Sequence, residues 1–263
     1  MAALTGLRIL DLTQYESGTS CTQALAWLGA DVVKLESPHG GDPGRTLSRG
    51  FFQDSEYFMN WNSNKRSIVV NLRDAKGRDL LLKLVPQFDV FIENFGPGVV
   101  EKLDIGYDVI KEIHPEVIYA QIKGFGLSGP YAQYKCFDMV AQAAAGALSI
   151  TGEPDGPPMR PGPTLGDSGS GVQMALAIAA AYAQKLRDGI GQHIELSMQE
   201  SVTYYMRTMI ALGAKGGTSV APRFGNELDP TINLFPSKPF GPNDYIYIMS
   251  VTEPHWVLFC KTI

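Results

Sequence analysis

Asp167 is the residue of this sequence whose surroundings best suit chemistry. It lies in LGDSGSG at 165–171, a run of small residues that leads into an alanine-rich helical pattern over 170–185. The start of a helix offers unpaired backbone N–H groups and a partial positive charge, both of which favour a carboxylate. The flanking glycines predict a carboxylate that is open to an electrophile. An ordinary helix N-cap fits the same segment, so the segment alone leaves two interpretations.

Other common catalytic patterns are missing. The turn after the strand expected over 7–12 has one glycine instead of the G-x-G-x-x-G fingerprint, although Glu36 ends the next strand as in dinucleotide-binding proteins. The sequence contains neither a Walker loop nor a G-x-S-x-G elbow. Its four histidines lack the spacing of metal ligands, so we expect no metal site.

Composition narrows the class of protein further. The 263 residues are 44% hydrophobic and 19% charged, and the net charge of −5 argues against general nucleic-acid binding. Three distant cysteines predict reduced thiols in a cytoplasmic protein. The most apolar stretch, 172–183, is shorter than a bilayer requires, so we expect no membrane association.

Strand and helix patterns alternate along the first 120 residues, which predicts an α/β fold with a doubly wound parallel sheet. This Rossmann-like sheet lacks the dinucleotide glycine fingerprint. Strands are expected at 7–12, 31–35, 67–71, 89–92, 117–122 and 193–197, and helices at 21–28, 75–85, 109–113, 140–148, 170–185 and 199–212.

The pattern changes after residue 212. Residues 213–244 are rich in Gly, Pro, Asn and Ser, which predicts a linker or lid between a large domain over 1–212 and the start of a smaller one over 245–263. A strand at 245–249 and a helix at 253–260 begin that smaller domain. The helix reaches residue 263 without a stop signal, so we expect the chain to be a piece of a longer protein.

A series of segments along the chain resembles the CaiB/BaiF family, the class III CoA transferases. The segments occur in order over most of the sequence, which makes the resemblance far more specific than any one of them. They are CTQALAWLGADVVKLE at 21–36, GDPGR at 41–45, NKRSI at 64–68, ENFGPG at 93–98, KGFGLSGPY at 123–131, VAQA at 140–143, GDS at 166–168, GQH at 191–193 and SMQ at 197–199.

This resemblance implies a chemistry for Asp167. In the family, the aspartate of the Gly-Asp motif attacks an acyl-CoA thioester and forms an acyl-aspartyl anhydride, then an aspartyl-CoA thioester. Backbone N–H groups at the helix start are expected to hold the oxyanion. The family also implies an interlocked homodimer, a chain longer than this one, and no metal or redox cofactor, since CoA is a substrate.

The formyl-CoA transferase branch of the family implies the residues that contact CoA. Three basic residues among them suit the phosphates of CoA. The matching positions here are Val70, Asn71, Leu72, Arg73, Asn94, Phe95, Gly96, Lys102, Lys135 and Met198, with Glu16 expected near the acyl group. Asp138 is expected either as a second carboxylate of the site or as the cap of the helix that follows it.

Several departures from that branch leave the substrate acids open. Glu16 stands where the branch has Gln, Ser37 where it has Arg, and residues 223–230 lack its tetraglycine loop. The racemases of the same family use a His directly before an acidic residue, and here that pair is Phe137 and Asp138. A racemase therefore lacks one of its two acid/base groups. A non-catalytic partner subunit is the remaining alternative.

Overall fold

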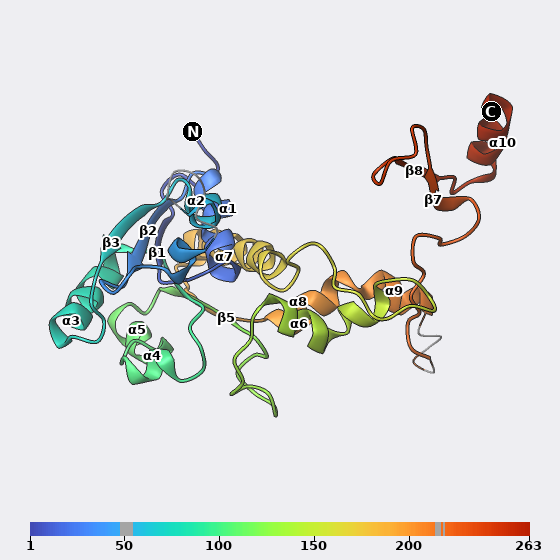
Figure 1. Cartoon of the computed structure of the whole chain (residues 1–263). Coiled ribbons are helices and arrows are strands. Elements are labelled where there is room, and N and C mark those ends of the chain that lie inside the picture. The colour runs from blue at the N-terminus through green and yellow to red at the C-terminus, as the bar shows by residue number, and fades with distance from the viewer. Residues whose placement is uncertain (48–54, 214–216, 218) are drawn as a thin grey trace. The chain divides into compact units, whose positions relative to one another are not determined.

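The computed structural model describes residues 1–47, 55–213, 217 and 219–263 (Figure 1). The chain forms two compact units. The first comprises 1–145 with 163–205, and the second comprises 146–162 with 206–263. The predicted domains over 1–212, 213–244 and 245–263 stay a prediction.

A six-stranded parallel sheet organises the first unit and confirms the predicted α/β fold. Its strand order is β3-β2-β1-β4-β5-β6, and each neighbouring pair is parallel. The chain therefore builds the sheet outward from β1 in one direction and then from β4 in the other. The strands are β1 (Arg8–Asp11), β2 (Asp31–Glu36), β3 (Arg66–Val69), β4 (Val90–Glu93), β5 (Ile118–Lys123) and β6 (Gln192–Ser197).

Helices cover the two faces of this sheet (Figure 1). On one face, Leu10, Phe91 and Tyr119 of the strands pack with Leu81 and Ile110 of the helices, because alternate strand residues point to the same side. The helices of the unit are α1 (Ser17–Trp27), α2 (Glu56–Asn62), α3 (Ala75–Leu84), α4 (Val99–Lys102), α5 (Tyr107–Ile113), α6 (Asp138–Ala145), α7 (Ser168–Asp188) and α8 (Met198–Tyr205), with 3-10 turns at Pro43–Thr46 and Val85–Gln87.

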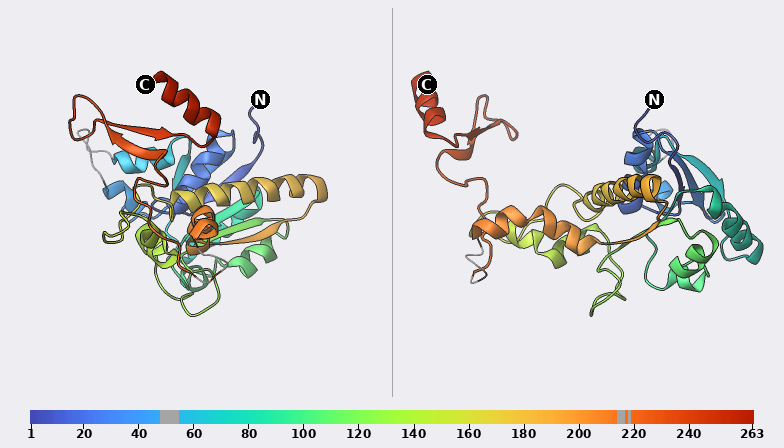
Figure 2. Two further views of the ribbon diagram at one scale, coloured as in Figure 1. Left: turned by 90° about the vertical axis from the view of Figure 1, so that its right-hand side faces the viewer. Right: turned by 180° about the vertical axis from the view of Figure 1, so that it is seen from behind.

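On the other face, α7 packs closely along α1 (Figure 2). The contact depends on Gly171, because a methyl group there would lie 2.0 Å from Ser20 Oγ and 2.8 Å from the carbonyl oxygen of Ser17. The small residues at the start of the long helix therefore have a packing role that the sequence pattern did not distinguish from a catalytic one.

Buried ion pairs fix the chain where it leaves β1 and β2. Lys65 lies 3.2 Å from Asp11, and Lys34 lies 2.8 Å from Asp42. Burial alone would raise the pKa of Asp11, but the charges of Lys65 and Lys34, together with hydrogen bonds from Thr13 and Thr22, lower it overall. The Lys34 ammonium also donates to the carbonyl of Thr13 at 2.6 Å. These contacts hold the segment that follows β1 in place.

Glu36 has a structural role rather than the ribose-binding role of a dinucleotide enzyme. Its carboxylate pairs with Arg45 at 2.7 Å and accepts from Ser67 at 2.6 Å. Burial raises its pKa, but Arg45, Ser67 and the backbone of Asp42 lower it overall, to about 2. A carboxylate bonded in this way is not available to a ribose.

The second unit contains α9 (Arg207–Gly213), β7 (Ile232–Pro236), β8 (Tyr245–Met249), α10 (Glu253–Thr262) and a 3-10 turn at Ala147–Ile150. The strands β7 and β8 pair in antiparallel register. β7 lies inside the segment predicted as linker or lid, so that segment is not entirely irregular.

The single helix predicted over 199–212 is two helices, α8 and α9. The sequence has neither glycine nor proline near the break at Met206, so its periodicity gave no sign of it. Among the helices of the described residues, none combines the length and the apolar character needed to cross a bilayer.

We expect Gly171→Ala to lower the free energy of unfolding by about 1–3 kcal/mol, because its methyl group forces α7 away from the backbone of α1. Urea unfolding followed by circular dichroism measures this. Gly162→Ala is the control, since a methyl group there meets nothing within 4 Å; it should stay within about 0.5 kcal/mol of the parent. Equal stability of the two variants would show that the α1–α7 contact tolerates the extra volume.

Candidate active site

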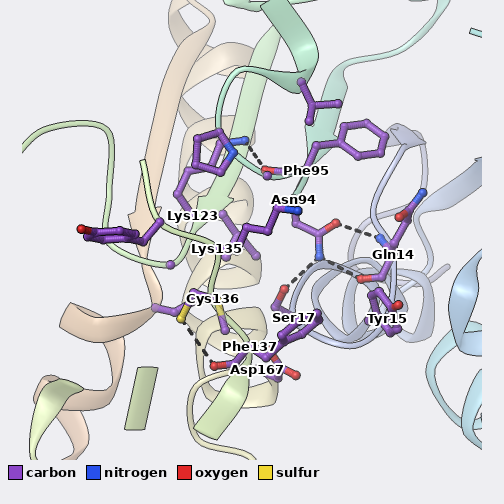
Figure 3. Close-up of a pocket in the computed structure, with 17 residues that line it drawn as sticks. Gln14, Tyr15, Ser17, Asn94, Phe95, Lys123, Lys135, Cys136, Phe137 and Asp167 are labelled. Carbon is purple, nitrogen blue, oxygen red and sulfur yellow. Dashed lines mark hydrogen bonds between the residues drawn. The ribbon is translucent and has the colours of Figure 1, made fainter. Parts of the chain in front are cut away.

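A cavity of about 340 Å³ opens at the carboxyl ends of the strands of the first unit (Figure 3). Gln14 and Tyr15 follow β1, and Asn94 and Phe95 follow β4. The sheet grows in opposite directions from these two strands, and open α/β sheets bind ligands at such a switch point. Lys123, at the end of β5, and Met198, directly after β6, also line it.

Asn94 joins the two segments that meet at the switch point. Its side-chain oxygen accepts the N–H of Gln14 at 2.8 Å. Its side-chain nitrogen donates to the carbonyl of Gln14 at 2.8 Å and to Ser17 Oγ at 2.9 Å (Figure 3). Because all three contacts reach the β1–α1 connection, Asn94 fixes the shape of this side of the cavity.

A buried ion pair supports the floor of the cavity. The Lys123 ammonium lies 2.7 Å from Glu93 and donates to the carbonyl of Phe95 at 2.8 Å. Both side chains are at most 7% exposed. Lys123 is therefore held by Glu93, and Lys135 is the exposed lysine at the cavity.

The carboxylate of Asp167 lies in the cavity and not in a cap. Asp167 is the N-cap residue of α7, yet its side chain makes no capping hydrogen bond. It lies near Cys136 and Phe137, which line the same cavity (Figure 3). The N-cap interpretation, which the sequence left open, therefore does not describe this side chain.

The backbone around Asp167 is already engaged in contacts of its own. The N–H groups of Ser168 and Gly169 are not free for an oxyanion, because both donate to the carbonyl of Thr164, at 2.9 and 3.4 Å. The glycines that flank Asp167 pack closely against neighbouring elements. A methyl group on Gly166 would lie 2.8 Å from the carbonyl oxygen of Asp138, and one on Gly169 would lie 2.8 Å from the ring of Tyr205.

Two further carboxylates act on Asp167. Burial, then the charges of Glu16 and Asp138, raise the pKa of Asp167 to about 7. Glu16 is 4% exposed and accepts hydrogen bonds from the hydroxyls of Thr164 and Tyr57.

Among the described residues, no three His, Cys, Asp or Glu side chains are arranged as ligands of one metal ion.

The residues predicted to contact CoA fall into three groups. Asn94, Phe95, Gly96, Lys135 and Met198 line the cavity with Asp167. A second cavity of about 320 Å³ collects Leu72, Arg73 and Lys102. Glu16, Val70, Asn71 and Asp138 line neither cavity, and the predicted contact of all these residues with CoA stays a prediction.

Sequence reasoning missed several residues of the first cavity. Gln14, Tyr15 and Lys123 stand at the ends of predicted strands, so the preference of α/β sheets for ligands at carboxyl ends was a usable signal. Cys136 precedes α6 and carried no such signal, whereas Phe137 entered the sequence analysis only as the position of the racemase histidine. Phe137 makes an edge-to-face contact with Tyr15, with ring centroids 5.8 Å apart.

Comparison with known proteins identifies the family. The sequence matches CoA-transferase family III over residues 4–263. The chain belongs to CoA-transferase family III. This confirms the resemblance to CaiB/BaiF proteins seen in the sequence motifs.

Individual members of the family are similar over most of this chain. It is 42% identical to the formyl-CoA:oxalate CoA-transferase of Streptomyces coelicolor, with 94% of this chain matched. It is 38% identical to that of Rhodopseudomonas palustris, with 99% of this chain matched. The chain spans 63% and 66% of the lengths of these two relatives.

Solved structures agree with this fold. A CaiB/BaiF family protein from Brucella suis is 31% identical and superposes with a TM-score of 0.87, covering 99% of this chain and 69% of its own. A protein from Mycobacterium tuberculosis is 28% identical and superposes with a TM-score of 0.82 over 100% of this chain and 68% of its own.

We expect Asp167→Asn to raise the free energy of unfolding at pH 8 by about 1–3 kcal/mol. With a pKa raised from 3.8 to about 7, the folded state holds this proton more tightly than the unfolded state. Stability contributed by the group therefore falls as pH rises from about 4 to 7, and the asparagine removes that loss.

Thermal unfolding of the parent protein and of Asp167→Asn between pH 4.5 and 8.5 tests the predicted pH dependence of stability. The gain of Asp167→Asn should shrink to nothing toward pH 4.5, whereas Asp155→Asn, at an exposed carboxyl, should give a flat difference. A gain that does not depend on pH would contradict the electrostatic origin.

Proposed function

We propose that the protein is a class III CoA transferase, which moves CoA from an acyl-CoA thioester to a small carboxylic acid. The observation that carries this proposal is the placement of Asp167. In a member of CoA-transferase family III, this carboxylate makes no capping hydrogen bond and lines a cavity at the switch point of the sheet. An aspartate with a raised pKa is also a stronger nucleophile than an ordinary carboxylate.

The reaction begins when an Asp167 oxygen attacks the carbonyl carbon of the thioester. The carbon–sulfur bond breaks, and CoA leaves as a thiolate that keeps the electron pair. The thiolate then attacks the aspartyl carbonyl of the anhydride, which releases the first acid as a carboxylate and leaves Asp167 as a CoA thioester. The acceptor carboxylate attacks this thioester, expels the thiolate and forms a second anhydride. Attack of the thiolate on the acceptor's acyl carbon completes the new acyl-CoA and frees Asp167.

The two cavities suit the two ends of CoA. Phe95 and Met198 give the first cavity apolar walls for pantetheine beside Asp167. Arg73 and Lys102 bring exposed cations to the second, which suits phosphates. Helix α4 connects them, since Val99 at its start lines the first cavity and Lys102 at its end lines the second.

The acids remain the open part of the proposal. Formyl-CoA and oxalate are the first pair to test, because relatives 38–42% identical carry those substrates in their names. The carboxylate of Glu16 near Asp167 opposes a second anionic group on the acid, so we favour monocarboxylic acids over oxalate. An interlocked homodimer in the cytoplasm belongs to the same proposal.

A racemase of the same family is the weaker alternative. Phe137 lines the cavity where a racemase needs an imidazole, and a phenyl ring cannot exchange a proton. Its neighbour Cys136 does not replace it. Burial, then the charge of Asp167, raise the pKa of the Cys136 thiol to about 11. A non-catalytic partner subunit is also disfavoured, since such a subunit has no need of an aspartate whose carboxylate lines the cavity without capping the helix.

Mixing the protein with formyl-, acetyl- and succinyl-CoA, followed by hydroxylamine trapping and mass spectrometry, tests the proposal. We expect a mass change on Asp167 that disappears in Asp167→Ala. The rate of adduct formation should fall on the acidic side of about pH 7, the pKa of Asp167, and this fall is the acid limb of the pH profile. Asp155→Asn should behave as the parent does. A folded protein that binds CoA without forming any adduct would rule out covalent catalysis.

Lys102→Ala should weaken CoA binding by about 5- to 10-fold, because one charged phosphate contact is worth about 1–1.4 kcal/mol. Isothermal titration with CoA measures the dissociation constant. Lys83→Ala, a variant at a lysine of α3 outside both cavities, should leave it unchanged. Equal affinities of the two variants would remove the second cavity from the CoA site.

A further inference from the structure

Asp138 is a buried carboxylate whose hydrogen-bond donors are all neutral. It is 8% exposed, and none of the ion pairs formed by the described residues includes it. Taking a carboxylate out of water without a cation costs several kcal/mol unless hydrogen bonds replace the lost solvent. The groups that donate these hydrogen bonds to Asp138 therefore indicate its role.

Asp138 is hydrogen-bonded to the backbone of the segment that carries Asp167. Its Oδ1 accepts the N–H of Gly166 at 2.9 Å and the N–H of Asp167 at 3.1 Å. Two consecutive peptide groups are thus tied to one oxygen. Gly166 makes this possible, since any side chain there would collide with the carbonyl oxygen of Asp138.

Gln142 links Asp138 to Pro163, at the start of the same segment. It lies one turn after Asp138 on α6, is fully buried, and donates to Asp138 Oδ2 at 2.8 Å and to the carbonyl of Pro163 at 3.1 Å. Helix α6 therefore holds 163–167 at both ends. A residue whose only role was to cap its own helix would not reach across to this segment.

We propose that Asp138 is a positioning residue for the nucleophile: it fixes the Gly166–Asp167 backbone, and its negative charge favours acylation of Asp167. This inference rests on the proposed function. When Asp167 becomes an anhydride or thioester it loses its negative charge, so its repulsion from Asp138 and Glu16 disappears. The charge on Asp138 thus destabilises the free carboxylate relative to the covalent intermediates.

The groups that face Asp167 come from several elements. Glu16 precedes α1, Tyr57 lies on α2, Asp138 on α6 and Cys136 before it. Lys123 and Lys135 line the same cavity, but Lys123 is paired with Glu93. Asp138→Asn removes one charge from this set and keeps an oxygen that can accept both N–H groups, while its amide nitrogen replaces the oxygen that accepts from Gln142.

The test measures the rate of adduct formation at Asp167 against pH in the complete protein, together with CoA affinity. We expect Asp138→Asn to move the acid limb down by about one pH unit and to slow acylation above pH 8 by about 5- to 10-fold. Asp138→Ala, which also releases the backbone, should slow acylation by about 100-fold. The CoA affinity of each variant, measured alongside, separates an effect on the rate of acylation from an effect on binding.

The outcomes separate this inference from the proposed function. If the parent forms no adduct at any pH, the proposed function fails. If the parent forms the adduct while Asp138→Asn keeps the same acid limb and a rate within twofold, the role of Asp138 is overturned. Should Asp138→Ala not fold, the acid limb of Asp138→Asn alone decides, because a purely structural residue would not move it.

Discussion

Repulsion among three carboxylates is the constraint on which the site of this protein depends. Asp167, Glu16 and Asp138 come from distant parts of the sequence, and burial strengthens the repulsion between them. A fold that gathers like charges must hold each one by other means. Here the means are neutral donors: hydroxyls of Thr164 and Tyr57 for Glu16, and backbone N–H groups for Asp138.

Three buried lysines of the first unit do not relieve this repulsion, because each is paired with another carboxylate. Lys34 pairs with Asp42, Lys65 with Asp11 and Lys123 with Glu93. These ion pairs lie at the carboxyl ends of β1, β2 and β4 and fix the segments that leave the sheet. The buried cations of the first unit thus hold its segments rigid and leave the cluster around Asp167 negative, which suits the nucleophilic role proposed for this carboxylate.

The glycines around Asp167 have a different purpose from the one their sequence suggests. Gly166, Gly169 and Gly171 each face a neighbouring element at a distance that excludes a methyl group. They let the start of α7 approach α6, α8 and α1 at the same time. The carboxylate of Asp167 lines the cavity while the backbone around it is tightly packed, which keeps its position defined.

The sequence by itself determined the parallel sheet, the long helix after Asp167 and the family motifs, because these depend on local periodicity and on short runs of residues. It also pointed to Asp167 and to Asn94, Phe95 and Gly96, which follow a strand. Only the tertiary structure decided that Asp167 is uncapped, that Asp138 turns toward the Gly166–Asp167 backbone, and that Phe137 lines the cavity. The physical reason is that capping, burial and charge repulsion depend on distances between residues far apart in the chain, and periodicity carries no information about those distances.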